Sequence, residues 1–398
     1  MIAEKIRMEG ETDMAMTLSV IVPVYNMASG DKLKWCLDSL VNQTIKDGRI
    51  EIIAVDDHST DDSFAIMKEY ERRYPERFLA VRSAANHHQG GAKNIGLALA
   101  RGAWIGFIDA DDWVVKDYYE QLLLWAARTG ADMVGCDYCL TGEHSWTVGQ
   151  VVHNNRPEQT GIMNTEKYRR LLLDTGSLVV KIYRRRIIYG NRRAADPAFA
   201  GDRDRLIRRD GTFTGTPEDI FPEDIFYEDN AVCNTWMLRA KHFEYISEPM
   251  YYYYQHGAST VHTITEKNLQ DRCTAARLMW EEAQRQGYAD TYRPELEFLF
   301  TVLFYVNTLF SAMPREQHIP DRYAFTRALA EEMKRTFPDF EQNPYYQERI
   351  DPEEKKLIAM QMKSHRQFYL YYRALWAYRD LRKKCGTRCH PYGGGKWE

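Results

Sequence analysis

The sequence predicts an α/β fold followed by a mainly α-helical C-terminal region. From Leu18 to about Asp137, short β-branched runs alternate with amphipathic stretches, which is typical of βαβ units around a parallel sheet. Polar residues directly follow several of these runs. From Thr265 onward the apolar spacing is almost entirely helical. The chain of 398 residues is therefore expected to form two domains.

The β-branched runs predict the strands of the first domain at Leu18–Val24, Ile50–Val55, Phe78–Val81, Trp104–Ile108 and Met133–Val134. Helical apolar spacing predicts helices between them at Lys32–Val41, Asp61–Arg73, Ala92–Ala100 and Lys116–Ala127. Ser59 or Thr60 is available as the N-cap of the second helix. Regularity is lost from about Thr141 to Gly211 and returns at Glu223.

The changes in pattern also set the expected domain boundaries. Residues 1–16 form an N-terminal extension, in which charged residues and the lack of an apolar run do not match a secretory signal. Residues 17–262 form the α/β domain, with an insertion at about 190–216 that is rich in Arg, Asp and small residues. Residues 263–398 form a helical C-terminal domain with a basic aromatic tail.

Composition limits the partners and the compartment. The chain has 53 Lys and Arg against 57 Asp and Glu, a net charge of −4, which is too close to neutral for a generic polyanion binder, so no nucleic-acid partner is expected. The 7 cysteines are an odd number spread over a long chain, which favours the reducing cytoplasm over a disulfide framework. The pairs Cys136/Cys139 and Cys385/Cys389 are too distant in the sequence to suggest a shared zinc site.

Two stretches of the helical region bear on membrane contact. The apolar stretch Leu296–Met313 is interrupted by Glu297 and followed by Pro314, and it lies at the lower limit for spanning a bilayer, so we expect a core helix. The tail Arg366–Arg388 interleaves basic and aromatic residues. It is typical either of a helix on an anionic membrane surface or of one buried in a homo-oligomer or against another domain, and the sequence leaves both open.

Polar groups follow three of the predicted strands. The first strand runs into Pro23-Val24-Tyr25-Asn26, the second into Asp56-Asp57-His58-Ser59 and the fourth into Asp109-Ala110-Asp111-Asp112. Ligands of open α/β sheets collect at the carboxyl ends of the strands. Hydroxyl, amide and carboxylate groups at that edge suit a nucleotide together with a divalent cation.

Several motifs occur in the order and spacing of a known family, namely Val20–Asn26, Val55–Asp61, Ala92–Gly96, Phe107–Asp112, Phe221–Glu223, Tyr227–Asn230 and Pro249–Tyr254. They closely resemble family 2 glycosyltransferases of the GT-A fold, of the bacterial, non-processive type. The resemblance covers roughly residues 17–262. It implies a Rossmann-like, nucleotide-diphospho-sugar transferase domain. The Gln-x-x-Arg-Trp signature of processive synthases is absent from the sequence.

The resemblance also implies a donor site made of Pro23, Val24, Tyr25, Asn26, Asp57, Lys93, Asp109, Ala110, Asp111 and His256. In it Asp57 pairs with the edge of the nucleotide base, and Asp109 and Asp111 hold Mn²⁺ or Mg²⁺. The cation would neutralise the departing diphosphate. The sequence departs from the family pattern at His58, where Gly is common, and at Lys93, where Arg is common.

The catalytic base has competing candidates, because Glu-Asp pairs recur at 218, 223 and 228. The resemblance implies that Asp229 deprotonates the acceptor hydroxyl and that Glu228 helps to hold the acceptor, with Asp224 as the alternative base. The apolar residues that follow place Asp229 at the start of a buried helix. Lys181 resembles an acceptor-side lysine of the family, although a basic helix face fits its surroundings equally.

Together these features predict a metal-dependent, inverting hexosyl- or N-acetylhexosaminyl-transferase. It would move a sugar from a nucleotide-sugar donor, in the first place a UDP-sugar, to a hydroxyl of a glycan or lipid-linked glycan acceptor in polysaccharide or other cell-surface glycan synthesis. The expected location is the cytoplasm, at the inner face of the cell membrane if the tail binds lipid. The alternative is a catalytically silent nucleotide-sugar-binding or assembly module that works through its helical region. A nucleotidyltransferase ranks last, because the loop after the first strand lacks a Gly- and Arg-rich sequence.

Overall fold

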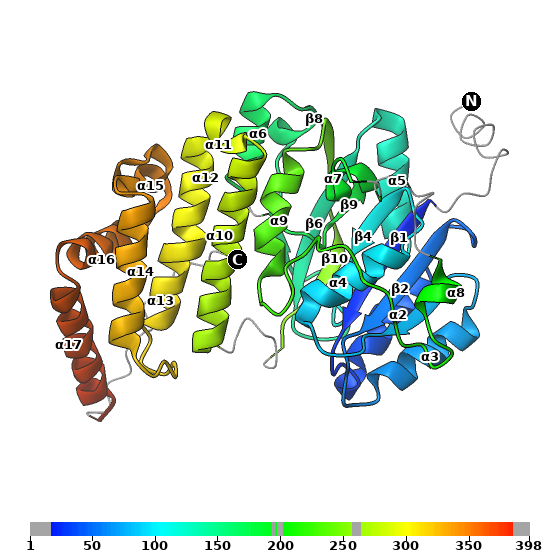
Figure 1. Cartoon of the computed structure of the whole chain (residues 1–398), viewed down its shortest axis with the longest axis horizontal. Coiled ribbons are helices and arrows are strands. Elements are labelled where there is room, and N and C mark those ends of the chain that lie inside the picture. The colour runs from blue at the N-terminus through cyan, green and yellow to red at the C-terminus, as the bar shows by residue number, and fades with distance from the viewer. Residues whose placement is uncertain are drawn as a thin grey trace. The chain divides into compact units, whose positions relative to one another are not determined.

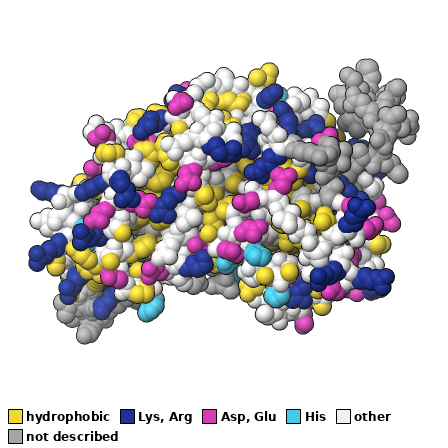
Figure 2. Space-filling model, in the orientation of Figure 1, with side chains coloured by type: hydrophobic (Ala, Val, Ile, Leu, Met, Phe, Trp, Pro, Cys, Tyr) yellow, Lys and Arg dark blue, Asp and Glu magenta, His cyan; other side chains and the backbone are white. Residues whose placement is uncertain are grey.

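The computed structural model describes residues 17–174, 176–192, 194, 196, 202–256 and 264–384. The chain divides into two compact units, Met1–Gly257 and Ala258–Glu398. Figure 1 shows that the first contains a sheet flanked by helices and that the second is built mainly of helices. The predicted α/β order followed by a helical region is therefore confirmed. Figure 2 shows acidic and basic side chains intermixed over the face that it draws.

One mixed sheet runs through the first unit in the strand order β3-β2-β1-β4-β9-β6-β10-β5. Its strands are β1 Leu18–Val24, β2 Ile50–Asp56, β3 Phe78–Arg82, β4 Trp104–Phe107, β5 Trp113–Val114, β6 Met133–Thr141, β9 Lys181–Arg184 and β10 His242–Tyr254. The short strands β7, Gln150–Val152, and β8, Gly161–Ile162, pair with β6 and β10.

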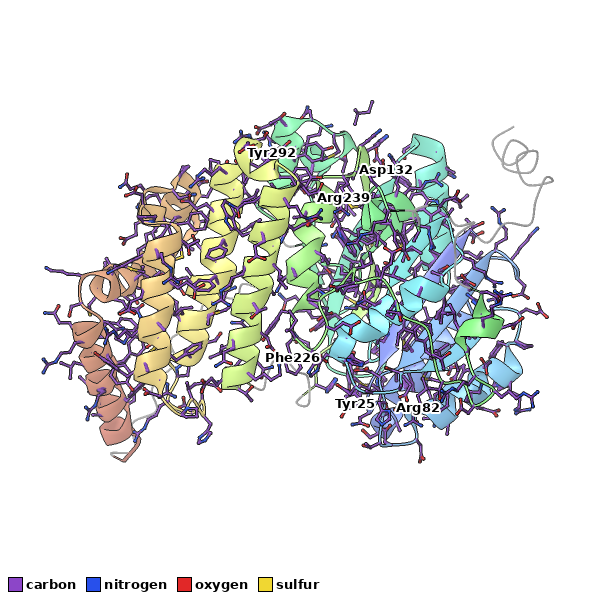
Figure 3. The ribbon with its side chains drawn as sticks, viewed as in Figure 1. Tyr25, Arg82, Asp132, Phe226, Arg239 and Tyr292 are labelled. Atoms are coloured by element: carbon purple, nitrogen blue, oxygen red, sulfur yellow. The ribbon has the colours of Figure 1, made fainter. Side chains whose placement is uncertain are left out.

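The expectation of a parallel sheet holds for β1 to β4 and is wrong beyond them. Strand β9 lies between β4 and β6 and runs antiparallel to both. Two antiparallel pairings in succession restore the direction, so β6, and β10 parallel to it, end at the same edge as β4. Figure 3 shows Tyr25, which follows β1, and Arg82, the last residue of β3, at this carboxyl edge. The strand ends that carry the predicted site residues therefore share one edge.

The helices of the first unit are α2 Lys32–Val41, α3 Ser63–Arg73, α4 His88–Leu99, α5 Tyr118–Thr129, α6 Thr165–Leu172, α7 Arg185–Tyr189, α8 Arg203–Leu206 and α9 Glu228–Met237. The predicted N-cap of α3 is wrong, since Asp62 occupies that position. Ser59 Oγ instead accepts a hydrogen bond from Asn26 N at 2.9 Å, and Thr60 N donates to Asn26 Oδ1 at 2.9 Å. Both residues therefore join the loops after β1 and β2.

Helices cover both faces of the sheet. On one face, Val20 of β1 belongs to the same hydrophobic cluster as Leu37 of α2 and Met67 of α3. On the other face, Ile21 lies against Gly96 of α4, where an added Cβ would come within 2.5 Å of Ile21 Cγ2. Because only glycine allows this approach, α4 packs close to the sheet and its N-terminus is fixed at the carboxyl edge.

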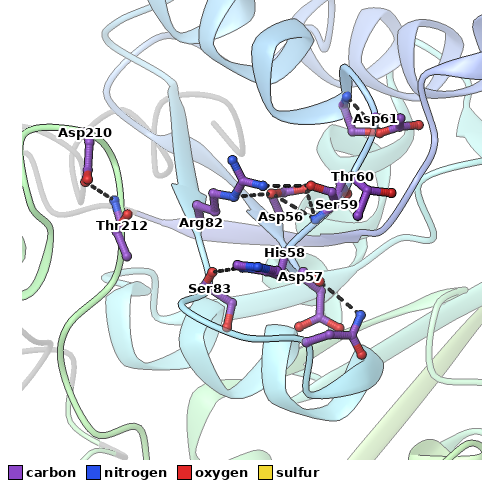
Figure 4. A network of polar contacts seen from close by, with 12 residues as sticks. Asp56, Asp57, His58, Ser59, Thr60, Asp61, Arg82, Ser83, Asp210 and Thr212 are labelled. Atoms are coloured by element: carbon purple, nitrogen blue, oxygen red, sulfur yellow. Dashed lines mark hydrogen bonds and ion pairs between the residues drawn. The ribbon is translucent and has the colours of Figure 1, made fainter.

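The edge strand β3 is covered by the segment that follows α8. Thr212 forms a parallel bridge with Arg82, Phe213 N donates to Arg82 O at 2.8 Å, and Arg82 N donates to Gly211 O at 2.9 Å. Within this segment Asp210 accepts a hydrogen bond from Thr212 N, as Figure 4 shows. Part of the predicted insertion therefore pairs with a strand edge that would otherwise be open to other chains.

The second unit contains α10 Glu266–Arg285, α11 Tyr288–Thr291, α12 Arg293–Phe300, α13 Asn307–Ala312, α14 Arg322–Thr336, α15 Pro344–Arg349, α16 Pro352–Lys363 and α17 His365–Lys384. A π-helical turn, Thr301–Val306, joins α12 to α13. The continuous stretch Arg293–Ala312 is long and apolar enough to cross a membrane, but 61% of its apolar window is buried. This burial is what the prediction of a core helix requires.

The cysteines of the described residues, Cys36, Cys136, Cys139, Cys233 and Cys273, are all buried and unpaired. None of these five thiols takes part in a disulfide. Cys385 and Cys389 lie outside the described residues.

Candidate functional site

Of the three acidic residues after β4, Asp112 is hydrogen-bonded within the protein, whereas Asp109 and Asp111 lie at the carboxyl edge of the sheet. Asp112 is buried and accepts hydrogen bonds from Tyr251 OH at 2.5 Å and from Tyr254 N at 2.8 Å. Both partners belong to β10. Asp112 therefore ties the loop after β4 to β10 and keeps the two other acids in place.

Asp111 lies beside His256, which follows β10, with 2.8 Å between Asp111 Oδ2 and His256 Nε2. Burial raises the pKa of Asp109 to about 7; Lys93 opposes this rise, whereas Asp111 and other nearby acids add to it. The intervening Ala110 is buried, so its methyl group packs inside the protein. The structure thus brings together the predicted residues Asp109, Ala110, Asp111 and His256.

Lys93 and Glu228 form a buried ion pair between α4 and α9. Lys93 Nζ lies 2.5 Å from Glu228 Oε1 and 3.1 Å from Gln89 Oε1, and both charged side chains are almost fully buried. Burial alone would lower the pKa of Lys93, but Glu228, Asp109 and Asp229 outweigh it and raise that pKa. Lys93 therefore fixes the start of α9 as well as lying among the site acids.

Asp229 is the second residue of α9, and its Oδ1 accepts a hydrogen bond from Asn230 N at 2.8 Å. Burial and the neighbouring Glu228 raise the pKa of Asp229 to about 6, against the opposing effect of Lys93. Val232 and Trp236 of the same helix are buried, so the predicted buried helix behind Asp229 is confirmed. By contrast, the alternative Asp224 is exposed and lies 3.3 Å from His87 Nδ1.

Asp57, at the end of β2, is buried with one carboxylate oxygen occupied. Its Oδ1 accepts from His87 N at 2.9 Å, whereas Oδ2 has no hydrogen-bond partner among the described residues. Burial raises the pKa of Asp57 to about 6. Asn86 Nδ2 donates to Asp57 O at 3.0 Å, and Figure 4 shows Asp57 beside His58 and Ser83. Oδ2 is thus a buried acceptor for an N–H group of a ligand.

The remaining predicted residues of the donor site lie along the end of β1. Pro23 and Val24 are buried within the strand, and Tyr25 is 47% exposed. Asn26 has the left-handed φ of 51° and links the loops after β1 and β2 through its side chain. The ring of Tyr25 is therefore at the surface, and the residue before it, Val24, accepts a hydrogen bond from Asp57 N at 2.8 Å. Pro23, Val24 and Asn26 shape the backbone on either side of Tyr25.

Lys181 lies in strand β9, so the alternative of a basic helix face is wrong. It is 1% exposed, and its Nζ donates to Ser177 O at 2.8 Å. Burial lowers the pKa of Lys181 to about 8. In this arrangement the side chain supports the segment before β9.

Backbone strain gathers around the same edge. The non-glycine residues with positive φ among the described residues are Asn26, Asp31, His58, His88, Asp224 and Tyr227. His58 has φ of 63°, which explains why glycine suits this position, since glycine reaches that conformation without strain. Strained residues of this kind persist where the surrounding structure fixes them, and they cluster at functional sites.

The sequence alone predicts no role for Asn94 of α4, although Asn94 belongs to the motif Ala92–Gly96. Its Nδ2 donates to Phe221 O at 2.9 Å and its Oδ1 accepts from Phe221 N at 2.9 Å. At Gly90 an added Cβ would lie 2.0 Å from Pro222 O. Both residues hold the segment before α9 against α4, and the only sequence signal for this was their place in or beside the motif Ala92–Gly96.

The described residues contain no group of three or more His, Cys, Asp or Glu side chains arranged to hold a metal ion. The donors that fit a hard cation are the two carboxylates Asp109 and Asp111, with His256 beside them. Mg²⁺ is commonly held by one or two carboxylates together with waters and substrate phosphates. The raised pKa of Asp109, which reflects burial among other acids, also fits a site that gains a positive charge. The donor set therefore fits Mn²⁺ or Mg²⁺.

Ligands of open α/β sheets, nucleotides among them, bind at the carboxyl ends of the strands, where these acids and the unpartnered oxygen of Asp57 lie. The family described as Glycosyl transferase family 2 matches residues 19–189. This match, together with glycosyltransferase relatives along 79% and 70% of the chain, supports a family 2 glycosyltransferase.

Individual relatives show how far the likeness extends. The uncharacterized glycosyltransferase YibD of Escherichia coli K12 is 29% identical over 327 residues, which are 79% of this chain and 83% of that protein. The poly(ribitol-phosphate) beta-glucosyltransferase of Bacillus spizizenii is 40% identical over 110 residues, 28% of this chain and 17% of that protein. Among solved structures, S. aureus TarS 1-349 in complex with UDP-GlcNAc has a TM-score of 0.47 and 19% identity, covering 85% of this chain and 78% of that one.

Proposed function

We propose that the chain is a metal-dependent, inverting glycosyltransferase that uses a UDP-sugar and transfers the sugar to a hydroxyl of a glycan or lipid-linked glycan. The observation that carries the proposal is the meeting of Asp111, His256 and Asp109 with Asp229 at one sheet edge. In this arrangement one group of acids suits a diphosphate-bound cation, and another acid suits the acceptor hydroxyl.

The preference for uracil rests on the free oxygen of Asp57. Oδ1 accepts a hydrogen bond from His87 N, whereas Oδ2 is buried and has no partner among the described residues. Uracil presents a single imide N–H, which one acceptor satisfies, whereas guanine presents an N–H and an amino group side by side and is better matched by two acceptors. The exposed ring of Tyr25 supplies a surface on which a base can stack.

Asp229 takes the acceptor proton in this proposal. A carboxylate with a pKa of about 6, raised by burial and by Glu228, is ionised at neutral pH and a stronger base than an exposed aspartate. The hydroxyl then attacks the anomeric carbon from the side opposite the leaving diphosphate, which inverts its configuration. A bound cation would supply the charge that neutralises the diphosphate. Lys93 and Glu228 keep Asp229 in place through their ion pair.

The proposed acceptor class rests on similarity to a bacterial relative. The bacterial relative that is 40% identical over 110 residues is a beta-glucosyltransferase of poly(ribitol-phosphate), which supports a hydroxyl of a polymer as the acceptor group. A hexose or N-acetylhexosamine is the corresponding donor sugar.

The proposed location is the cytoplasmic face of the cell membrane, with helix α17 as the contact. Leu370, Tyr371 and Tyr378 of α17 are each about half exposed, at 51%, 46% and 53%. Arg366 and Arg373 are exposed on the same helix. Apolar and aromatic side chains flanked by basic ones suit an anionic bilayer surface.

The transfer reaction is tested by incubating the protein with Mn²⁺ and a panel of UDP-, GDP- and dTDP-sugars, and measuring nucleoside diphosphate release with and without cell-derived glycans. UDP release that needs the cation and rises above the slow acceptor-free rate when the glycan is added supports the proposal, and an anomeric proton coupling in the product reports inversion. Release of GDP alone, or release unaffected by EDTA, would overturn the donor or the metal assignment.

Membrane contact is tested by sedimentation with phosphatidylglycerol vesicles. The triple variant Leu370→Ser, Tyr371→Ser, Tyr378→Ser should lose binding that the wild type shows, with Tyr25→Ser, a change at a 47% exposed tyrosine of the first unit, as the control. Unchanged sedimentation of the triple variant would reject α17 as the contact. A fall in oligomer size instead of vesicle binding would assign the helix to self-association.

A further inference from the structure

A cluster of aromatic rings lies between the candidate metal site and the protein surface, and the proposed reaction does not use it. The cluster consists of Trp35 of α2, Trp113 of β5, His144 and Trp146 of the loop between β6 and β7, and Tyr252 and Tyr254 of β10. We call these six residues the aromatic platform. Its outer member, Trp146, is 52% exposed. A tryptophan exposed at the end of a continuous aromatic cluster differs from the single apolar side chains that are scattered over any surface.

The rings form a continuous series that reaches the site. Trp146 lies 5.8 Å from Trp35 between ring centroids, Trp35 stacks on His144 at 5.4 Å, and His144 lies 4.5 Å from Tyr254. Tyr254 in turn lies 5.1 Å from His256, the residue that contacts Asp111. The platform is therefore continuous with the candidate metal site.

The loop that carries Trp146 is held in a fixed conformation. Tyr252 OH donates to Trp146 O at 3.0 Å. At Gly149 an added Cβ would lie 1.9 Å from Leu140 O, so the loop returns in close contact with β6. Thr141 Oγ1 donates to Glu143 O at 2.9 Å. Because the backbone is anchored at several points, one side of the Trp146 ring packs on Trp35 and Tyr252 while the rest stays available to a ligand.

Along the carboxyl edge of the sheet, the aromatic platform lies on one side of Asp111, and Asp57, the proposed contact of the nucleotide base, lies on the other. Asp57 follows β2, Asp111 follows β4, and the platform lies around β6, β10 and β5, in the strand order β2-β1-β4-β9-β6-β10-β5. A donor whose base reaches Asp57 and whose diphosphate reaches Asp111 leaves the platform free. A ligand on the platform would therefore be the acceptor.

The chemistry of the platform suits a pyranose ring. The negative face of an indole ring attracts the weakly positive C–H groups that cover one face of such a sugar. The exposed or partly exposed neighbours of Trp146 in its loop include the polar residues Glu143, Ser145 and Thr147 and the apolar residue Val148, which is 49% exposed. The polar ones can bind the hydroxyls at the sugar's rim. A lipid chain would instead need an apolar surface without this polar surround.

We propose that Trp146 and Trp35 bind a sugar unit of a glycan acceptor, at a subsite separate from the hydroxyl that reacts. This inference rests on the proposed function, because it assigns the platform to the acceptor of that reaction. A remote subsite raises the affinity for an extended glycan and leaves the donor site unaffected.

The test uses saturation-transfer NMR and intrinsic fluorescence with cellotetraose, chitotetraose and maltotetraose as pyranose probes on the full chain. Wild type should bind at least one tetrasaccharide at millimolar concentration. Trp146→Ala should weaken that binding by about tenfold, in keeping with the loss of one stacking contact, whereas Trp146→Phe should retain most of it. Tyr378→Ala, a change at an equally exposed aromatic residue of the second unit, should have no effect.

Donor hydrolysis separates this inference from the reaction itself. UDP release from the UDP-sugar without acceptor should be unchanged in Trp146→Ala, which also shows that the variant is folded. Two outcomes would overturn the platform and leave the proposed function standing, provided that a nucleotide sugar is turned over. One is equal tetrasaccharide binding by wild type and Trp146→Ala. The other is no tetrasaccharide binding by wild type. Failure of every nucleotide sugar to turn over, with tetrasaccharide binding that depends on Trp146, would overturn the proposed function and leave a glycan-binding surface.

Discussion

Lys93 Nζ lies 2.5 Å from Glu228 Oε1, and this buried ion pair joins helix α4 to the first turn of α9. The pair lies among Asp109 and Asp229, so Lys93 is the cation that balances several acids. A buried charge left without its partner is strongly destabilising, even where the intact pair adds little stability. The Lys93–Glu228 pair therefore links the stability of the first unit to the position of the proposed base.

Lys93→Met should lower the free energy of unfolding by about 3–5 kcal/mol, because it leaves Glu228 buried beside other acids. Glu228→Gln should have a smaller effect, since Lys93 keeps Asp109 and Asp229 as neighbours. Urea unfolding followed by tryptophan fluorescence measures both. The control is Lys34→Met, which removes an exposed pair with Asp31 and should change stability by less than about 1 kcal/mol. Equal effects of Lys93→Met and Lys34→Met would contradict this view.

Asp57→Asn should stabilise the protein at pH 8 and weaken its binding of UDP. The folded pKa of Asp57 is about 6, above its ordinary value of 3.8, so the ionised carboxylate destabilises the folded state. This penalty is absent below about pH 4, grows between pH 4 and 6, and is complete above pH 6. Asparagine keeps an oxygen for His87 N and has no charge, so the gain is of the order of 1–3 kcal/mol at pH 8.

Thermal unfolding of wild type and Asp57→Asn at pH 4.5 and pH 8 measures the first effect, and calorimetric titration with UDP measures the second. A gain in melting temperature that is equal at both pH values would reject burial of the charge as its cause. Unchanged UDP affinity would show that Asp57 does not bind the uracil base.

His256→Ala should raise the Mn²⁺ concentration needed for half-maximal activity by about 10- to 100-fold, the usual effect of losing a side chain that orients a metal-binding carboxylate. The reason is its 2.8 Å contact with Asp111. The matched control is His153→Ala, which removes another His–Asp contact, to Asp137 at 2.9 Å. Activity titrations with Mn²⁺ measure both variants, and an identical response of the two would show that His256 has no part in cation binding.

Gly90→Ala should destabilise the first unit by about 1–3 kcal/mol, as overpacking does in a close-packed site. The added Cβ would meet the backbone oxygen of Pro222 at 2.0 Å, which cannot move without shifting the start of α9. Gly142→Ala, where nothing lies within 4 Å of the added Cβ, is the control. Melting temperatures of the two variants check the prediction, and a similar value for both would mean that the contact between α4 and Pro222 is loose.

The sequence predicts the parallel half of the sheet well and the rest poorly, for physical reasons. Strand β1 and helix α2 have the predicted bounds, because β-branched and amphipathic patterns there match burial closely. Strand β9 was not foreseen, since the short segment Lys-Ile-Tyr-Arg carries charge at both ends and pairs antiparallel between two strands distant in the chain. Pattern reasoning follows local periodicity, and this pairing is not local.

The site shows the same division. Motif order indicated which acids would meet at the carboxyl edge, because parallel strands end together. It could not show that Lys93 would turn away from solvent to pair with Glu228, or that Asp112 would be used by Tyr251 and Tyr254. Such contacts depend on the packing of α9 and β10 against segments more than a hundred residues earlier in the chain, as the separation of 135 between Lys93 and Glu228 shows.

The most direct measurement of the central claim is the turnover number of Asp229→Asn beside Asp224→Asn, from nucleoside diphosphate release with Mn²⁺ and an active donor and acceptor. We predict that Asp229→Asn loses at least about 100-fold in kcat, the usual contribution of a general base, while Asp224→Asn keeps activity within a few-fold. Wild-type kcat/KM should also fall as the pH drops below about 6, since Asp229 must be ionised and its pKa is about 6. Near-normal turnover by Asp229→Asn, or a large loss confined to Asp224→Asn, would contradict the assignment of the base.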